Sequence, residues 1–91
     1  MKYFIQDGVR RALASREDRR KTVPAVIIRE GEKKVYRSHV DLNELYTSKR
    51  TVERDLRFLR IVSPIYEHII LEPLGVRGQP SAIPLSKVRL T

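Results

Sequence analysis

Ninety-one residues, 41% apolar and 33% charged, suffice for one small domain and match neither a membrane-spanning nor a disordered chain. Cysteine is absent, which excludes a disulfide scaffold, a thiolate nucleophile and the common cysteine-ligated zinc sites. The positive charge is concentrated in three segments: residues 1–21 carry +4, residues 48–60 carry +3 and residues 73–91 carry +3, and the −2 of residues 61–72 brings the net charge to +8. If the fold brings these segments together, they form the basic surface expected of a polyanion-binding protein.

The N-terminal segment is predicted to form a helix from Tyr3 to about Ala14. Ile5, Val9 and Leu13 recur at i, i+4 and i+8, the spacing of one helix face. Gly8 lies inside this helix and costs it about 1 kcal/mol relative to alanine. Because residues 15–21 have no large apolar side chain, we treat residues 1–21 as an N-terminal helix and basic connector, followed by a domain over residues 22–91.

The next segment permits two interpretations. Thr22 can cap a helix that tolerates Pro24 in its first turn and stops at Gly31, with Val23, Val26 and Ile27 on one side. The competing interpretation is a strand over residues 25–29 that turns back at residues 30–31. We favour the helix.

Shorter elements follow in the middle of the chain. Residues 34–37 are a candidate strand. Asp41 is expected to cap a short helix over residues 42–46, with Glu44 placed to complete a capping-box-like pair. A tight turn at residues 47–48 then leads into another helix.

Residues 48–60 carry the most informative pattern in the chain. Ser48 is expected to cap a helix with an apolar stripe at the i, i+4 and i+7 positions. The stripe consists of Val52, Leu56 and Leu59. The opposite side of this helix carries Arg50, Arg54 and Arg57. Such a helix can pack by one side and offer guanidinium groups to a nucleic-acid groove, although a solvated charged face is the simpler alternative.

The C-terminal third is predicted to be a hairpin. Residues 66–72 favour a strand, residues 73–81 form a loop with two glycines and two prolines, and residues 82–90 return as a strand with Pro84 at a sheet edge. The order of elements predicts a helix-rich α+β fold, a winged helix-turn-helix. It has a three-helix core, a C-terminal β-hairpin wing and an extra N-terminal helix.

The segment from Ser48 to Leu59 resembles the recognition helix of winged helix-turn-helix regulators of the deoxyribonucleoside-repressor and biotin-repressor type. The shared positions are a serine, Arg-Thr, a β-branched residue, Arg-Asp-Leu and a further leucine. Residues 41–45 look like the preceding helix, and residues 76–81 are similar to the Gly-Arg-Pro wing. The resemblance covers residues 22–90. The chain departs from it at residues 60–66, where the family often has a short acidic run and a glycine.

The resemblance implies a transcription regulator, a repressor by type, that inserts the helix of residues 48–60 into the major groove of double-stranded DNA and rests its basic wing on the backbone or minor groove. The residues expected to contact DNA are Ser48, Lys49, Arg50, Thr51, Glu53, Arg54, Arg57, Arg77, Gln79 and Lys87. We expect no cofactor, metal ion, small-molecule ligand or enzymatic activity. The histidines have no second ligand at metal-binding spacing, and no nucleophile–base pair is evident.

The partners and location expected from the sequence follow from the same interpretation. The stripe of Ile5, Val9 and Leu13 could pack on its own domain or form a homodimer on a palindromic site. No apolar stretch typical of a signal peptide follows Met1, so we expect a cytoplasmic protein of an archaeon, a bacterium or one of their viruses or plasmids. The main alternative is a winged-helix module that binds an acidic protein. An RNA-binding role ranks last, because the basic segments contain few aromatic residues.

Overall fold

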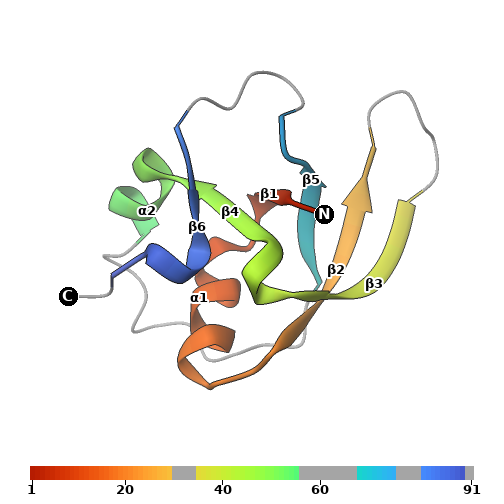
Figure 1. Cartoon of the computed structure of the whole chain (residues 1–91), viewed down its shortest axis with the longest axis horizontal. Helices are drawn as coiled ribbons and strands as arrows, with labels where there is room; N and C mark the ends of the chain where they lie inside the picture. The colour runs from red at the N-terminus through yellow and green to blue at the C-terminus, as the bar shows by residue number, and fades with distance from the viewer. Residues whose placement is uncertain (30–34, 56–67, 76–80, 90–91) are drawn as a thin grey trace.

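The structure is a computed structural model that describes residues 1–29, 35–55, 68–75 and 81–89 (Figure 1). Six strands form one sheet. They are β1 (Tyr3–Asp7), β2 (Thr22–Ile28), β3 (Val35–Asp41), β4 (Leu45–Ser48), β5 (Ile69–Pro73) and β6 (Ala82–Pro84). The helical elements are α1 (Val9–Glu17), α2 (Lys49–Asp55) and the single 3-10 turns η1 (Leu42–Glu44) and η3 (Leu85–Lys87).

The sheet is mixed, with the strand order β3-β2-β5-β1-β4-β6. Strand β1 lies near the middle, parallel to β4 and antiparallel to β5. Strand β2 is parallel to β5 and antiparallel to β3, and β6 runs antiparallel to β4. The N-terminal seven residues therefore bind the two halves of the sheet together.

One face of the sheet carries the core. Alternate residues of β1, β2 and β4 are buried, and the register aligns core residues of neighbouring strands: Ile5 and Ile27 both lie opposite Leu71, and Ala25 lies opposite Ile69. The helical elements place their buried side chains in the same core. These side chains are Val9, Ala12, Leu13, Leu42, Val52 and Leu85. The helices thus cover one face of the sheet, which defines an outer face on its other side.

The predicted winged helix-turn-helix is wrong. The described residues form a six-stranded mixed sheet with two α-helices instead of a three-helix core. The expected wing is not a hairpin, because β5 pairs with β1 and β2 whereas β6 pairs with β4 at the sheet edge. Pro84 does lie on an edge strand, as predicted. None of the described helices has the length and apolar character needed to cross a membrane.

The preferred helix over residues 22–31 is also wrong, and the competing strand is correct in kind. Strand β2 buries Val23, Ala25 and Ile27, which recur with the period of two typical of a strand. Its β-branched residues fit a pleated sheet better than a helix. The strand predicted at residues 34–37 is confirmed from residue 35 onward within β3, and the turn expected at residues 30–31 lies outside the described residues.

The predicted N-terminal helix divides at Gly8 into β1 and α1. Ile5, Val9 and Leu13 are all buried, because a strand and a helix in succession bring them to one core. Residues 1–21 therefore contribute to the same sheet and core as the rest of the chain. A homodimer stays a prediction, but these three side chains contact the interior of their own chain, so a dimer would use another surface.

The element after Asp41 is shorter than predicted. Asp41 caps it as expected, since its carboxylate accepts a hydrogen bond from the Asn43 N–H at 2.8 Å. The helix predicted to reach residue 46 ends after η1, and β4 follows with alternating burial. Glu44 lies 3.4 Å from the N-terminal amine instead of completing a capping box. Because β4 replaces the tight turn at residues 47–48, no helix-turn-helix forms there.

Gly8 makes the junction between β1 and α1 possible. Its φ of 102° lies in the left-handed region, and a Cβ at this position would lie 2.6 Å from Cγ2 of Ile69. Gly75 has a similar φ of 94°, but no atom would lie within 4 Å of its added Cβ. The two glycines thus share the backbone requirement and differ in the contact with the core.

We predict that Gly8→Ala destabilises the protein more than Gly75→Ala does. Both substitutions strain the backbone, at about 1–3 kcal/mol, but only Gly8→Ala also forces Ile69 or α1 to move. Urea denaturation of both variants measures the difference in unfolding free energy. Equal losses would mean that the approach of Ile69 has no energetic consequence.

Thr47 is a second unusual feature of the core. It is fully buried, and its Oγ1 atom has no hydrogen-bond partner among the described residues. Burying a hydroxyl without a partner is unfavourable. Thr51 provides a contrast, because its Oγ1 lies 2.8 Å from Oγ of Ser48.

We predict that Thr47→Val stabilises the protein by up to about 1 kcal/mol, because valine keeps the shape and removes the buried hydroxyl. Thr51→Val is the matched control, and it should destabilise by about 1 kcal/mol because it removes a hydrogen bond. Thermal unfolding of the two variants should shift the midpoint in opposite directions. A lower midpoint for Thr47→Val would show that its hydroxyl has a stabilising partner.

Candidate nucleic-acid interface

Helix α2 begins where the sequence predicts. The Oγ atom of Ser48, the last residue of β4, accepts a hydrogen bond from the Thr51 N–H at 3.2 Å. The Thr51 hydroxyl lies 2.8 Å from the same oxygen. This cap allows the chain to pass directly from strand to helix, because the serine satisfies a free N–H of the first turn.

Val52 holds α2 against the core, with only 8% of its surface exposed. The exposed residues on the other side of the helix are Lys49, Arg50, Glu53 and Arg54. Three cations and one carboxylate thus face solvent on a helix whose opposite side packs on the core. The predicted contrast between an apolar anchor and a basic side is confirmed for the described part of this helix, Lys49–Asp55.

A shallow groove of about 500 Å³ lies at the start of α2. Its lining residues are Ser48, Lys49, Arg50, Glu53 and Ser81. Ser81 reaches this position because β6 pairs with β4, with Ala82 opposite Ser48. The groove therefore combines two cationic side chains and one carboxylate with hydroxyl groups from segments that are far apart in the sequence.

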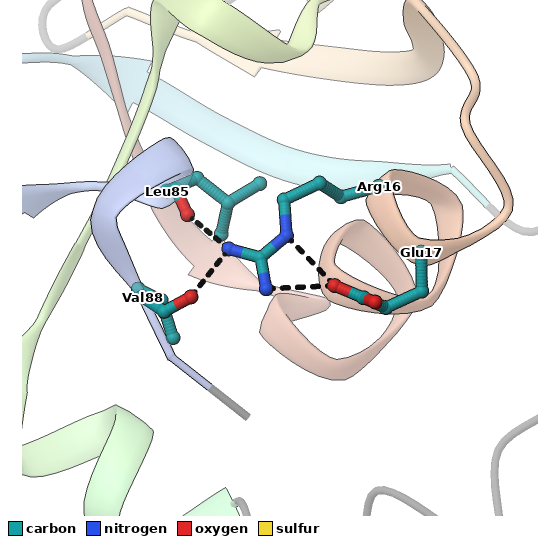
Figure 2. A network of polar contacts seen from close by, with 4 residues as sticks. All are labelled: Arg16, Glu17, Leu85 and Val88. Atoms are coloured by element: carbon teal, nitrogen blue, oxygen red, sulfur yellow. Dashed lines mark hydrogen bonds and ion pairs between the residues drawn. The ribbon is translucent and has the colours of Figure 1, made fainter. Parts of the chain in front are cut away.

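The C-terminal segment is attached to α1 through Arg16 (Figure 2). One guanidinium nitrogen, Nη1, donates to the carbonyl oxygens of Leu85 at 2.6 Å and Val88 at 2.7 Å. The Nε and Nη2 atoms donate to Oε1 of Glu17 at 3.1 and 2.8 Å, which orients the planar group. A single arginine thereby clamps the turn η3 with charge-assisted hydrogen bonds.

This clamp determines where the last basic residues lie. Leu85 and Val88 are buried, whereas Lys87 and Arg89 are exposed between and after them. Lys87 was expected on a wing strand, but it ends η3 instead. Figure 1 shows the C-terminal segment on the same side of the sheet as α1 and α2. We use the term basic surface for Lys49, Arg50, Arg54, Lys87 and Arg89.

The structure brings together six of the ten predicted DNA contacts in or next to α2. They are Ser48, Lys49, Arg50, Thr51, Glu53 and Arg54. Thr51 is half-buried and its hydroxyl lies against Ser48, so it is less accessible than its neighbours. The predicted contacts Arg57, Arg77 and Gln79 lie outside the described residues.

Sequence reasoning missed two residues of this region. Ser81 was assigned to a loop, and only the pairing of β6 with β4 reveals its position in the groove. Arg16 was placed in a connector without apolar residues, and its role depends on carbonyl groups about 70 residues away. The helix predicted from the sequence ends near Ala14, whereas α1 continues to Glu17 and carries Arg16 on its last turn, so the sequence offered no signal for this role.

In the described part of the chain, no three histidine, aspartate or glutamate side chains gather as metal ligands would. Comparisons with protein-family models, with curated proteins and with solved structures gave no match for this chain. The geometry and charge of the basic surface are therefore the features from which a function can be proposed.

We predict that Arg16→Gln destabilises the protein by about 2 kcal/mol, because two carbonyl groups lose a charged donor. Arg10→Gln removes the same charge from an exposed position of α1 and should change stability by less than about 0.5 kcal/mol. Arg16→Lys should give an intermediate loss, since an ammonium lacks the planar fork. Urea denaturation gives the three values, and equal losses for Arg16→Gln and Arg10→Gln would argue against the clamp.

Proposed function

We propose that this protein binds double-stranded DNA through the basic surface. The observation that carries the proposal is the construction of α2: Val52 fixes it to the core, and Lys49, Arg50 and Arg54 face solvent. A helix fixed in this way presents cations with a defined spacing. Clamping of the C-terminal segment by Arg16 supports the proposal further, because it gives Lys87 and Arg89 a defined place.

The chemistry of these side chains suits a duplex. Lysine and arginine neutralise phosphates and release counterions, which accounts for most non-specific affinity. Arginine can also bridge the two major-groove acceptors of guanine. Arg50, at the entrance of the groove beside α2, is the best placed for a base contact, and Arg54, one turn later, for a phosphate. A role in transcription regulation is the corresponding biological proposal.

We predict salt-dependent duplex binding in which Arg50 and Arg54 differ. Arg50→Ala should reduce the preference among duplex sequences, by about 1–3 kcal/mol if the contact is bidentate. Arg54→Ala should weaken binding to all sequences alike and lower the slope of log K against log salt by about 1. Fluorescence anisotropy with a selected duplex and a scrambled duplex, repeated over a salt series, measures both effects.

Lys21→Gln is the charge-matched control, since Lys21 is exposed in the turn between α1 and β2, which Figure 1 shows well away from α2. It should leave affinity and salt slope nearly unchanged. If the wild-type protein does not bind duplex DNA at low salt, the proposal is wrong and an acidic protein becomes the better candidate partner. Equal losses for all three variants would indicate diffuse attraction without a defined surface.

A further inference from the structure

The outer face of the sheet carries an aromatic pair. Phe4 of β1 and Tyr46 of β4 are direct register partners on adjacent parallel strands. Each alternates with buried residues of its strand, so both lie on the face away from the helices. Both are half-buried, and neither belongs to the core cluster. Two neighbouring rings are thus presented on the central strands of the sheet.

This face is reachable from solvent at several points. Lys2, Gln6 and Ile28 share it and are exposed, with Ile28 at 38%. The carboxylate next to the rings, that of Glu72, is itself buried at 7% and accepts a hydrogen bond from Nε2 of Gln6 at 2.7 Å. Glu72 is also the register partner of Phe4, so its carboxyl group lies on this same face, where the hydrogen bond from Gln6 occupies one of its oxygens.

One cation lies over the aromatic pair and two others lie near it. The Lys2 ammonium lies 5.6 Å from the centre of the Tyr46 ring, a cation–π distance. On the other side, Ser48 follows Tyr46 by two residues on the same face of β4, about 7 Å along the strand. Ser48 lines the groove that contains Lys49 and Arg50. Ser48 therefore links the aromatic pair to the groove, and we use the term strip for Phe4, Tyr46 and Ser48 together with the groove cations Lys49 and Arg50.

We propose that this strip binds an unpaired segment of DNA, with bases stacked on Phe4 and Tyr46 and phosphates held by Lys2, Lys49 and Arg50. Stacked bases need rings that solvent can reach, and an accompanying backbone needs cations beside them. The three cations Lys2, Lys49 and Arg50 favour a polyanionic strand over an apolar protein segment. The inference extends the proposed function, since Lys49 and Arg50 serve both surfaces, and its natural substrate is a duplex with a single-stranded tail.

The test compares three probes: a blunt duplex, the same duplex with a tail of twelve thymidines, and the free twelve-thymidine oligonucleotide. The tailed duplex should bind about tenfold tighter than the blunt one, because base–aromatic stacking contributes about 1–3 kcal/mol per base. Phe4→Leu and Tyr46→Leu keep apolar bulk and remove the rings, so each should abolish most of this tail-dependent gain. Circular dichroism and thermal unfolding establish that the variants are folded.

Two further variants separate stacking from other effects. Tyr46→Phe keeps the ring and should retain the gain. Ile28→Ala removes an exposed apolar side chain from the same face, on β2, and should also retain it. The chain has four tyrosines and no tryptophan, so tyrosine fluorescence quenched by the oligonucleotide in wild type but not in Tyr46→Leu reports stacking directly.

Equal affinity for tailed and blunt duplexes would overturn the inference and leave the proposed duplex binding intact. Binding of the tailed duplex without binding of the blunt duplex would overturn the proposed duplex binding and leave the single-strand inference intact. Loss of the tail-dependent gain in Ile28→Ala would overturn the single-strand inference by showing that apolar contact, not stacking, is measured.

Other occupants of this face give different results. A concentration-dependent dimer that Tyr46→Leu dissociates would assign the face to a second copy of the chain. An oligouridine competitor tests whether RNA replaces DNA, and tighter RNA binding would contradict the assignment to DNA.

Discussion

The close approach of Gly8 to Ile69 is the constraint on which the other features depend. Strand β1 lies between β4 and β5, so the chain must leave the middle of the sheet at once and return over it as α1. A positive φ allows this turn, and the missing Cβ lets the backbone lie directly on β5. The position of α1 then places Arg16 beside the carbonyl groups of η3, and it places α1 against α2. The basic surface is thus supported by a turn at the opposite end of the sequence.

The features that the sequence predicted correctly depend on a few neighbouring residues. Ser48 and Asp41 act as caps because the N–H groups they bind lie two or three positions ahead, whatever the surrounding fold. The separation of Val52 from the basic residues of α2 follows equally from helix periodicity. The position of Pro84 at an edge follows from its missing N–H. Each of these predictions requires only local geometry.

The features that the sequence predicted incorrectly depend on pairing between segments that are distant in the chain. The spacing of Ile5, Val9 and Leu13 fits one helix, yet a strand, a turn and a shorter helix bury the same three residues. Nothing local reveals that β5 inserts between β1 and β2, or that β6 joins β4. Strand alternation in β2 was visible, but β-branched residues at mixed spacing also fitted a helix face. Tertiary pairing decided between these alternatives.

The nucleic-acid proposals depend on the local features of α2, so they do not require the winged-helix fold that was predicted wrongly. The resemblance to a recognition helix covers a dozen residues, and it concerns a capped helix with an apolar anchor and a basic side. The described part of α2 has this construction without the helix-turn-helix around it. The observed fold differs from the predicted one in the elements that lie next to α2. Strand β4 enters α2 directly, so Tyr46 shares a strand face with Ser48, which lines the groove, a relation that a tight turn between two helices would not produce. The sheet therefore adds an aromatic surface beside the cations, and single-stranded DNA becomes a ligand that the winged-helix interpretation gave no reason to consider.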